Sequence, residues 1–254
     1  MAKIVVFDSG LGSLSIIKEI QKIAKTDIVY FADQKNYPYG TKSQAQLNKI
    51  MKKTINLLEE KFMPDIIVVA SNTPSLILNL QTKKIVDVKP PLKLAQKKSK
   101  TKKIAILATK SAINSRGLGH YIKENNIPKS YKIFKINGSN LVDLVESGKF
   151  LNNKNCCSKI IKKSLEQIIM LEKIDTITLS STHLLFLKLL LKKEFPEIEF
   201  VDPGKIVAAK VFLKIKNKQS KRNTLKIFTS GNVNNFKSKL NKIGIKNKVN
   251  FLST

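Results

Sequence analysis

The sequence predicts an α/β protein with two similar lobes, each a mostly parallel sheet flanked by helices, related by a pseudo-twofold and holding a ligand cleft between them. Three observations lead to this fold class. Short, continuously apolar stretches alternate with amphipathic stretches of helical spacing. Polar and small residues close the apolar stretches, and the alternation begins again near the middle of the 254-residue chain. Buried strands separated by helices are typical of parallel sheets covered on both faces.

The first part of the chain supplies the elements of one lobe. In order, we expect a strand in 3–10, a helix in 14–24, a strand in 27–33, a helix in 46–62 and a strand in 65–70. The first of these helices has one apolar face, formed by Leu14, Ile17, Ile20 and Ile23. Ligands of parallel α/β sheets bind at the carboxyl ends of the strands, so the polar residues that follow the strands are candidate site residues.

The pattern starts again after residues 88–103, where two prolines and a cluster of lysines predict a crossing between lobes. The stretch 104–115 is a second version of 4–15, and 175–185 lines up with 65–75 at a constant offset of 110 residues. Two such lobes facing each other would hold a small ligand between their paired turns.

The charge distribution limits the class of partner. The chain carries 47 Lys and Arg against 18 Asp and Glu, a net charge of +29, which attracts polyanions. Only Arg116 and Arg222 are arginines, and the lysine-rich stretches contain no interleaved aromatic residues on which bases could stack. The composition therefore argues against specific nucleic-acid binding and indicates a solvated, lysine-rich surface.

The sequence also predicts a location and the absence of a metal. No apolar run reaches the ~18 residues of a membrane helix, and the N-terminus at Met1 leads directly into the first strand without the apolar core of a signal peptide. Cys156 and Cys157 are neighbours, which rarely satisfies disulfide geometry, and the only histidines are His120 and His183. We therefore expect a cytoplasmic protein with no membrane contact and no metal site.

Polar residues close the predicted strands of both lobes: Asp8, Ser9, Asp33, 37–40, 71–73, Thr109, Ser115 and 181–183. Their hydroxyl, amide and backbone N–H groups suit a small zwitterionic ligand with a carboxylate. Taken singly, Asp8, Ser71 and Ser181 also fit helix caps, and His183 fits a buried, hydrogen-bonded histidine. The recurrence of the turns as a pair favours a site.

Six motifs extend over nearly the whole chain: VFDSGLGSLS (6–15), YPYGTKS (37–43), SNT (71–73), LVDLVESG (141–148), STH (181–183) and TSG (229–231). As an ordered set they resemble the cofactor-independent glutamate racemases of the aspartate/glutamate racemase superfamily. The resemblance implies that the C-terminal segment returns to the first lobe. We therefore expect residues 1–95 plus 208–254 in the first lobe and 96–207 in the second.

The resemblance also implies an activity, a site and partners. The family converts L-glutamate to D-glutamate between its lobes without pyridoxal phosphate or a metal, so no cofactor is expected. The expected partner is a small acidic amino acid, glutamate or aspartate, and a homodimer is also compatible with the family. Substrate-binding positions correspond to Ser9, Tyr39, Gly40, Asn72, Thr73 and Thr182. The family positions that assist acid/base chemistry correspond to Asp8, Glu146 and His183.

Ser71 and Ser181 depart from the family pattern. Family members carry a cysteine at each position, one on each face of the amino acid, so that one removes the α-proton and the other returns it. A thiol with a pKa of about 8.5 is partly thiolate at neutral pH, whereas a serine alkoxide is not available at equilibrium. We therefore expect the chain to bind an acidic amino acid and to racemise it weakly or not at all.

Two other functions fit the same residues. A non-catalytic amino-acid-binding or regulatory protein with a basic surface would bind a ligand or a polyanion without turnover. In a serine-nucleophile hydrolase, His183 would act as base toward Ser71 or Ser181, oriented by Asp8 or Glu146. The sequence contains no G-x-S-x-G motif, which argues against a hydrolase. Natural loss of the cysteines and a substitution made to trap a ligand would give the same sequence.

Overall fold

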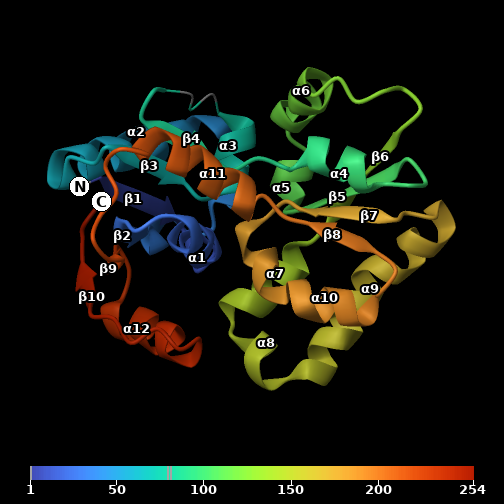
Figure 1. Ribbon diagram of the computed structural model, residues 1–254. Coiled ribbons are helices and arrows are strands. Elements are labelled where there is room, and N and C mark those ends of the chain that lie inside the picture. Colours follow the sequence, from blue (N-terminus) through green and yellow to red (C-terminus); the bar gives the residue numbers. More distant parts are fainter. Residues whose placement is uncertain (1, 79, 81) are drawn as a thin grey trace. The chain divides into compact units, whose positions relative to one another are not determined.

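A computed structural model describes residues 2–78, 80 and 82–254 (Figure 1). Met1, on which the argument against a signal peptide depended, lies outside the described residues. The chain divides into two compact units, Met1–Val88 with Gly204–Thr254, and Lys89–Pro203. The lobe boundaries predicted after residues 95 and 207 fall within helices α4 (Leu92–Lys98) and α11 (Gly204–Ile215).

The first unit is built on a parallel sheet. Its described strands are β1 (Lys3–Asp8), β2 (Asp27–Ala32), β3 (Ile66–Val69), β4 (Ile85–Asp87), β9 (Thr224–Thr229) and β10 (Val249–Phe251). They are ordered β10-β9-β2-β1-β3-β4, and each neighbouring pair is parallel. Because β9 pairs with β2, the C-terminal segment is part of the same sheet as the N-terminal strands.

Helices cover both faces of this sheet. Val5 and Phe7 of β1 pack in one apolar cluster with Leu47 and Met51 of α2 (Gln44–Phe62). The alternate strand residues lie on the opposite face, where Tyr30 of β2 contacts Phe236 at a ring-centroid distance of 6.0 Å. Helix α1 (Ser13–Ile23) packs against α11. The unit also contains α3 (Asn72–Ile77), α12 (Val233–Lys242) and the 3₁₀ turns η1 (Gln34–Asn36) and η2 (Tyr39–Thr41).

The predicted helices of this unit are present, with small differences at their ends. In α1 the predicted apolar face is buried except for Ile23, which is 47% exposed because it is the last residue of the helix. Helix α2 begins two residues before the predicted range because Ser43 caps it. The Ser43 hydroxyl accepts from the Gln46 N–H at 3.2 Å, and the Gln46 side chain accepts from the Ser43 N–H at 2.9 Å, which forms a capping box.

The second unit contains a smaller parallel sheet. Its described strands, in the order β6-β5-β7-β8, are β6 (Lys132–Asn137), β5 (Lys103–Ala108), β7 (Thr176–Leu179) and β8 (Glu199–Val201). Leu107 packs in the main core, and Ile104 packs on the opposite face against Ala95 of α4. The remaining helices are α5 (Lys110–Ile113), α6 (Arg116–Glu124), α7 (Ser139–Glu146), α8 (Lys149–Asn152), α9 (Lys154–Glu172), η3 (Thr182–Leu187) and α10 (Lys188–Glu194).

The two sheets share one local arrangement. Phe7 of β1 pairs with Val69 of β3, and Leu107 of β5 pairs with Leu179 of β7. In each unit, the N–H that follows β3 or β7 donates to the Phe7 or Leu107 carbonyl at 2.8 Å. The predicted fold class, with two parallel sheets flanked by helices, is confirmed.

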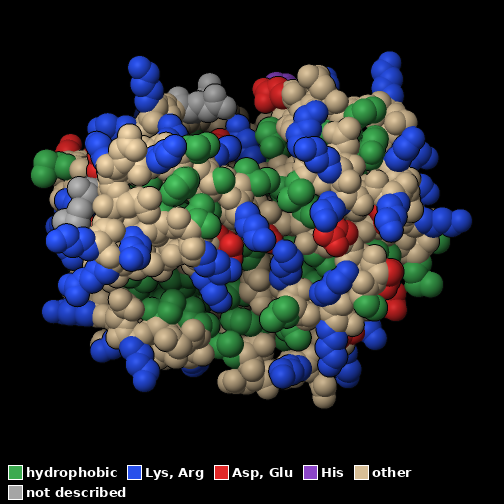
Figure 2. Space-filling view, in the orientation of Figure 1, with side chains coloured by type: hydrophobic (Ala, Val, Ile, Leu, Met, Phe, Trp, Pro, Cys, Tyr) green, Lys and Arg blue, Asp and Glu red, His purple; other side chains and the backbone are tan. Residues whose placement is uncertain are grey.

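Lysine and arginine side chains are scattered over the face visible in Figure 2, with acidic side chains among them. Within the described residues, no helix is long and apolar enough to cross a bilayer, and no group of three or more His, Cys, Asp and Glu side chains could hold a metal ion. Cys156 and Cys157 lie in the first turn of α9 and are free.

Candidate functional site

The predicted site residues divide between the two units. The first unit contains Asp8, Ser9, Tyr39, Gly40, Ser71, Asn72 and Thr73, and the second contains Glu146, Ser181, Thr182 and His183. In the first unit, β1, β2 and β3 end at the same edge of the sheet, because Asp8 pairs with Ala32 and Phe7 with Val69. The side chains that follow these strands are therefore gathered at the carboxyl edge, where parallel sheets bind ligands.

The turn after β1 is held by local hydrogen bonds. The Asp8 carboxylate accepts from the Ser9 N–H at 2.7 Å, and the Tyr30 hydroxyl donates to the Gly10 carbonyl at 2.6 Å. Asp8 and Ser9 are both buried. Helix α1 has Gly12 at its N-cap and no side-chain cap. The interpretation of Asp8 as a helix cap is therefore wrong, and its carboxylate lies in the turn before the helix.

Ser71 and Ser181 occupy equivalent turns. Ser71 precedes α3 with φ −140° and ψ 126°, and Ser181 precedes η3 with φ −141° and ψ 134°. Both residues stand at N-cap positions, but neither side chain makes a capping hydrogen bond. The cap interpretation is right about the position of these serines and wrong about the role of their hydroxyls. Their exposed fractions are small, 9% for Ser71 and 6% for Ser181.

Asn72 carries a buried amide. The residue is 3% exposed, and neither its Oδ1 nor its Nδ2 has a hydrogen-bond partner within the described part of the chain. A buried polar group in this state costs about 1–3 kcal/mol, so most buried amides in proteins are paired. Asn72 directly follows Ser71, and Thr73 beside it is also buried. An amide in this position suits the carboxylate or ammonium group of a ligand.

Tyr39 lies at the beginning of the turn η2, followed by Gly40. Its hydroxyl donates to Asp33 Oδ2 at 3.0 Å, and the side chain is buried. Burial raises the pKa of Tyr39 well above its ordinary value, and the charges of Asp33 and Asp8 raise it further. The Tyr39 hydroxyl therefore stays protonated at neutral pH and lies within the electrostatic influence of the Asp8 carboxylate.

In the second unit, the structure brings two predicted acid/base residues together. Glu146 is the last residue of α7, and His183 lies in η3. The Glu146 Oε1 and His183 Nε2 atoms are 2.7 Å apart, and each side chain is 8% exposed. A carboxylate bound to one ring nitrogen orients the imidazole and leaves the other ring nitrogen to other partners. Thr182, between Ser181 and His183, is buried as well.

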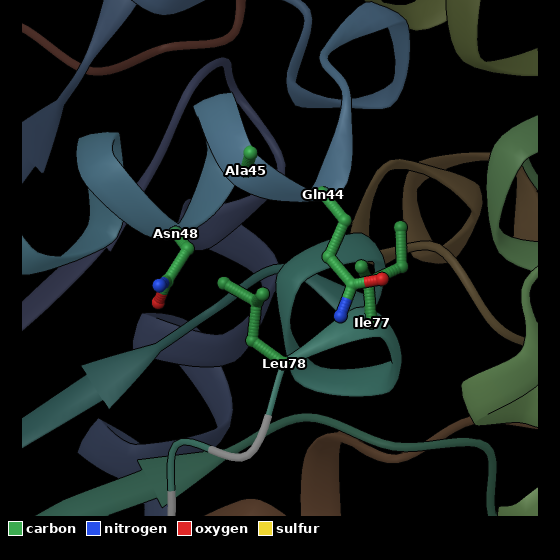
Figure 3. Close-up of a pocket in the computed structure, with 5 residues that line it drawn as sticks. All are labelled: Gln44, Ala45, Asn48, Ile77 and Leu78. Atoms are coloured by element: carbon green, nitrogen blue, oxygen red, sulfur yellow. The ribbon is translucent and has the colours of Figure 1, made fainter.

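A surface cavity of about 530 Å³ also lies in the first unit. Gln44, Ala45 and Asn48 line it from the first turns of α2, and Ile77 and Leu78 line it from the end of α3 (Figure 3). The Gln44 side chain extends from α2 toward Ile77 in this view. None of the five lining residues is a predicted site residue. The cavity is therefore distinct from the residues that the sequence indicates.

Two contributing residues were not among the site residues predicted from the sequence. Tyr30 reads as an ordinary apolar strand residue, yet its hydroxyl anchors the Gly10 carbonyl. Ser230 belongs to the C-terminal TSG motif, and its hydroxyl donates to Asp33 at 3.0 Å across 197 residues of sequence. The sequence indicated Asp33 only as a polar strand end. The TSG motif marked the right segment, but the partner of Ser230 depends on the pairing of β9 with β2.

A search of solved structures recovers the same fold. The crystal structure of Escherichia coli glutamate racemase in complex with L-glutamate and the activator UDP-MurNAc-Ala matches with a TM-score of 0.84 and 22% identity. The match covers 99% of this chain and 98% of that chain. At this identity the match shows the fold, a two-unit α/β protein with a parallel sheet in each unit.

Sequence relatives define the family. A glutamate racemase of Buchnera aphidicola subsp. Schizaphis graminum is 32% identical over 229 residues, 87% of this chain and 88% of the relative, and that of Aquifex pyrophilus is 32% identical over 213 residues, 81% and 80%. The chain belongs to the glutamate racemase family. No protein-family model matches the sequence.

Proposed function

We propose that this chain binds a small acidic amino acid, with glutamate as the first candidate, and that Ser71 and Ser181 make it a weak or inactive racemase. The observation that carries the binding proposal is the buried Asn72 amide, whose two polar atoms have no partner among the described residues. A ligand carboxylate and ammonium would satisfy such an amide. The choice of glutamate is supported by the family and by the ligand of the Escherichia coli structure.

The proposed roles follow the positions of the residues in each unit. The substrate carboxylates and ammonium group would be held by Ser9, Tyr39, Gly40, Asn72, Thr73 and Thr182. Asp8 and Glu146 would position or transfer protons, and His183 would support the group at Ser181. The 2.7 Å contact between Glu146 and His183 supports this pairing of roles.

The low acidity of the serine hydroxyl is the reason to expect little or no racemisation. Removal of an α-proton needs a base whose pKa is matched to the working pH, and a thiolate meets this condition far better than an alkoxide. A serine becomes reactive when a histidine takes its proton during attack, but this does not provide a standing base for a carbon acid. We therefore expect Ser71 and Ser181 to preserve the site and to suppress the proton transfer.

The test is α-proton exchange in deuterated water, followed by NMR, for L- and D-glutamate and for both aspartate enantiomers. We expect no measurable exchange in the unmodified chain and clear exchange of glutamate in the Ser71→Cys, Ser181→Cys double variant, because two thiols restore two bases. Calorimetric titration of the same proteins with glutamate measures binding separately from turnover.

The controls are internal to the chain. Each single cysteine variant supplies one base, so we expect it to favour exchange of one enantiomer over the other. Cys156 and Cys157 show whether a thiol elsewhere is sufficient, because the unmodified chain contains both. Exchange by the unmodified chain would contradict the argument from serine acidity. Absence of glutamate binding in all variants would contradict the substrate assignment.

A further inference from the structure

We propose that Ser75 is a positioning residue for the side chain at position 71, and that it acts by tying the Ser71 carbonyl to the backbone at Val88. The consequence for proton transfer rests on the proposed function. The hydrogen bonds that carry the proposal lie within the first unit alone.

The Ser75 hydroxyl joins two backbone groups. Ser75 lies in α3, four residues after Ser71, and is 2% exposed. Its hydroxyl donates to the Ser71 carbonyl at 2.7 Å and accepts from the Val88 N–H at 3.3 Å. A hydroxyl has one proton to donate and lone pairs with which to accept, so one side chain serves both contacts. The turn at Ser71 is thereby connected to a distant part of the chain.

Val88 is the point at which the chain leaves the first sheet. The pairing of β4 with β3 covers Ile85–Asp87, and the N–H of the next residue donates to the Ser75 hydroxyl. Val88 is fully buried, and a buried N–H without an acceptor is costly. Ser75 therefore holds the turn at Ser71 against a buried segment that is itself part of the sheet on one side.

Serine is not the residue that a helix alone would favour at position 75. A hydroxyl that bonds to the carbonyl four residues earlier often bends a helix and slightly destabilises it, and alanine has the higher helix propensity. The Ser71 side chain makes no capping hydrogen bond, so the backbone of the turn determines where this side chain lies. A serine at position 75 is accounted for if the position of that backbone matters.

The equivalent turn of the second unit lacks this contact. At the offset of 110 that relates Ser71 to Ser181, Leu185 takes the place of Ser75 and packs against the apolar core. The Ser181 carbonyl accepts instead from the Leu184 N–H at 3.0 Å, within the 3₁₀ turn η3. An effect of Ser75 should therefore fall on position 71 and leave position 181 unchanged.

The test combines Ser75→Ala with each single cysteine variant. In the Ser71→Cys background, we expect Ser75→Ala to slow α-proton exchange of the favoured glutamate enantiomer roughly tenfold, because small displacements of a reacting group are costly. In the Ser181→Cys background, the rate of exchange should stay the same. An equal loss in both backgrounds would overturn the proposal, since Ser75 would then act on the fold in general.

The matched control is Ser164→Ala. Ser164 of α9 donates to the Ile160 carbonyl four residues earlier, also at 2.7 Å, and lies in the second unit. It therefore reports the general effect of removing such a hydroxyl from a helix. We expect no loss of exchange in either cysteine background. A loss in the Ser71→Cys background as large as that caused by Ser75→Ala would contradict a specific role of Ser75.

Alkylation by iodoacetamide tests the positioning without any amino acid. Mass spectrometry of the labelled peptides distinguishes a thiol introduced at position 71 from Cys156 and Cys157. Ser71 is 9% exposed, so loosening of its turn by Ser75→Ala should raise the alkylation rate there severalfold and leave a thiol introduced at position 181 unaffected.

The two measurements fail in different ways. If neither single cysteine variant exchanges glutamate, the proposed function fails together with the consequence for proton transfer. An alkylation rate at position 71 that Ser75→Ala leaves unchanged overturns the positioning role, whether or not glutamate is exchanged.

Discussion

At the scale of single residues, Asn72 illustrates a conflict between stability and binding. Its amide is buried with no partner among the described residues, so the folded protein bears an unfavourable contribution at this position. Residues that bind ligands often carry such a contribution, because the groups that satisfy them arrive with the ligand. Replacing the amide should therefore change stability and binding in opposite directions.

We expect Asn72→Leu, which has a similar volume, to raise the free energy of unfolding by about 1–3 kcal/mol and to abolish glutamate binding. The control is Asn153→Leu. Asn153 caps α9 by accepting from the Cys156 N–H at 3.0 Å, so its loss should lower the free energy of unfolding by about 1 kcal/mol. Urea unfolding measures both changes, and destabilisation by Asn72→Leu would contradict the expected effect.

The sequence located many candidate residues but few of their partners. Asp8, Ser71 and Ser181 were predicted at strand ends from the alternation of apolar runs, and the structure places them there. The pairing of Asp33 with Ser230 could not be predicted, because it depends on which strand β9 joins. The hydrolase alternative named Asp8 or Glu146 as the group that orients His183, and the structure shows Glu146 in contact with it. Residue spacing could not choose between the two, because the contact depends on the packing of α7 against η3.

At the scale of elements, the starts of β3 and β7 are fastened in matching ways. Asp65 precedes β3, where its carboxylate accepts from the Lys3 N–H at 3.0 Å and from the Lys218 ammonium at 2.9 Å. Asp175 precedes β7, where its carboxylate accepts from the Ser99 hydroxyl at 2.6 Å and from the backbone N–H groups of Lys100 and Thr101. Each aspartate ties the amino edge of its sheet to neighbouring segments.

These contacts predict a loss of stability in acid. The backbone hydrogen bond from Lys3 and the contact with Lys218 lower the pKa of Asp65. For Asp175, burial acts to raise the pKa, but the hydrogen bonds from Ser99, Thr101 and Lys100 outweigh it and the net shift is downward. A carboxylate with a lowered folded-state pKa stabilises the protein above the unfolded pKa of about 4, and this stabilisation is lost as pH falls through the folded pKa.

Thermal unfolding as a function of pH tests this prediction. We expect the melting temperature to fall below about pH 4, and Asp65→Asn or Asp175→Asn to flatten that part of the curve, because each removes one of the linked protonations. The exposed Glu60 provides the control, and Glu60→Gln should keep the acid dependence of the unmodified chain. Parallel curves for all four proteins would show that these carboxylates are not the cause.

Element types were more predictable than element boundaries and order. The strands and helices of the first 70 residues were expected from apolar periodicity and are present. Residues 88–103 were interpreted as a crossing because of their two prolines and their lysines, yet helix α4 forms within this segment after Pro91 and packs on the second sheet through Ala95. Strand order, such as β9 beside β2, results from long-range pairing that local patterns do not encode.

At the scale of the whole molecule, the net charge of +29 should oppose folding through self-repulsion. On the face shown in Figure 2, basic side chains are scattered without a compact patch, which argues against a dedicated polyanion site on that face. Such a distribution acts as a diffuse repulsive field. Its effect should depend on ionic strength more than on any single lysine.

We therefore expect added salt to stabilise the chain. Raising sodium chloride from about 10 mM to about 200 mM shortens the Debye length from about 30 Å to below 10 Å. A gain of about 1 kcal/mol corresponds to a rise in melting temperature of about 2–4 °C for a protein of this size. Choline chloride at the same ionic strength is the control for specific ion binding. A constant or lower melting temperature would contradict the prediction.

The return of the C-terminal segment to the first sheet has a consequence for biosynthesis. Strand β2 leaves the ribosome early, but its neighbour β9 is made only after the whole of Lys89–Pro203. Until then, β2 has an open edge, which is prone to pair with other chains. The second unit is continuous in sequence and so is complete before the first. A nascent chain that stalls before residue 224 would lack both β9 and Ser230.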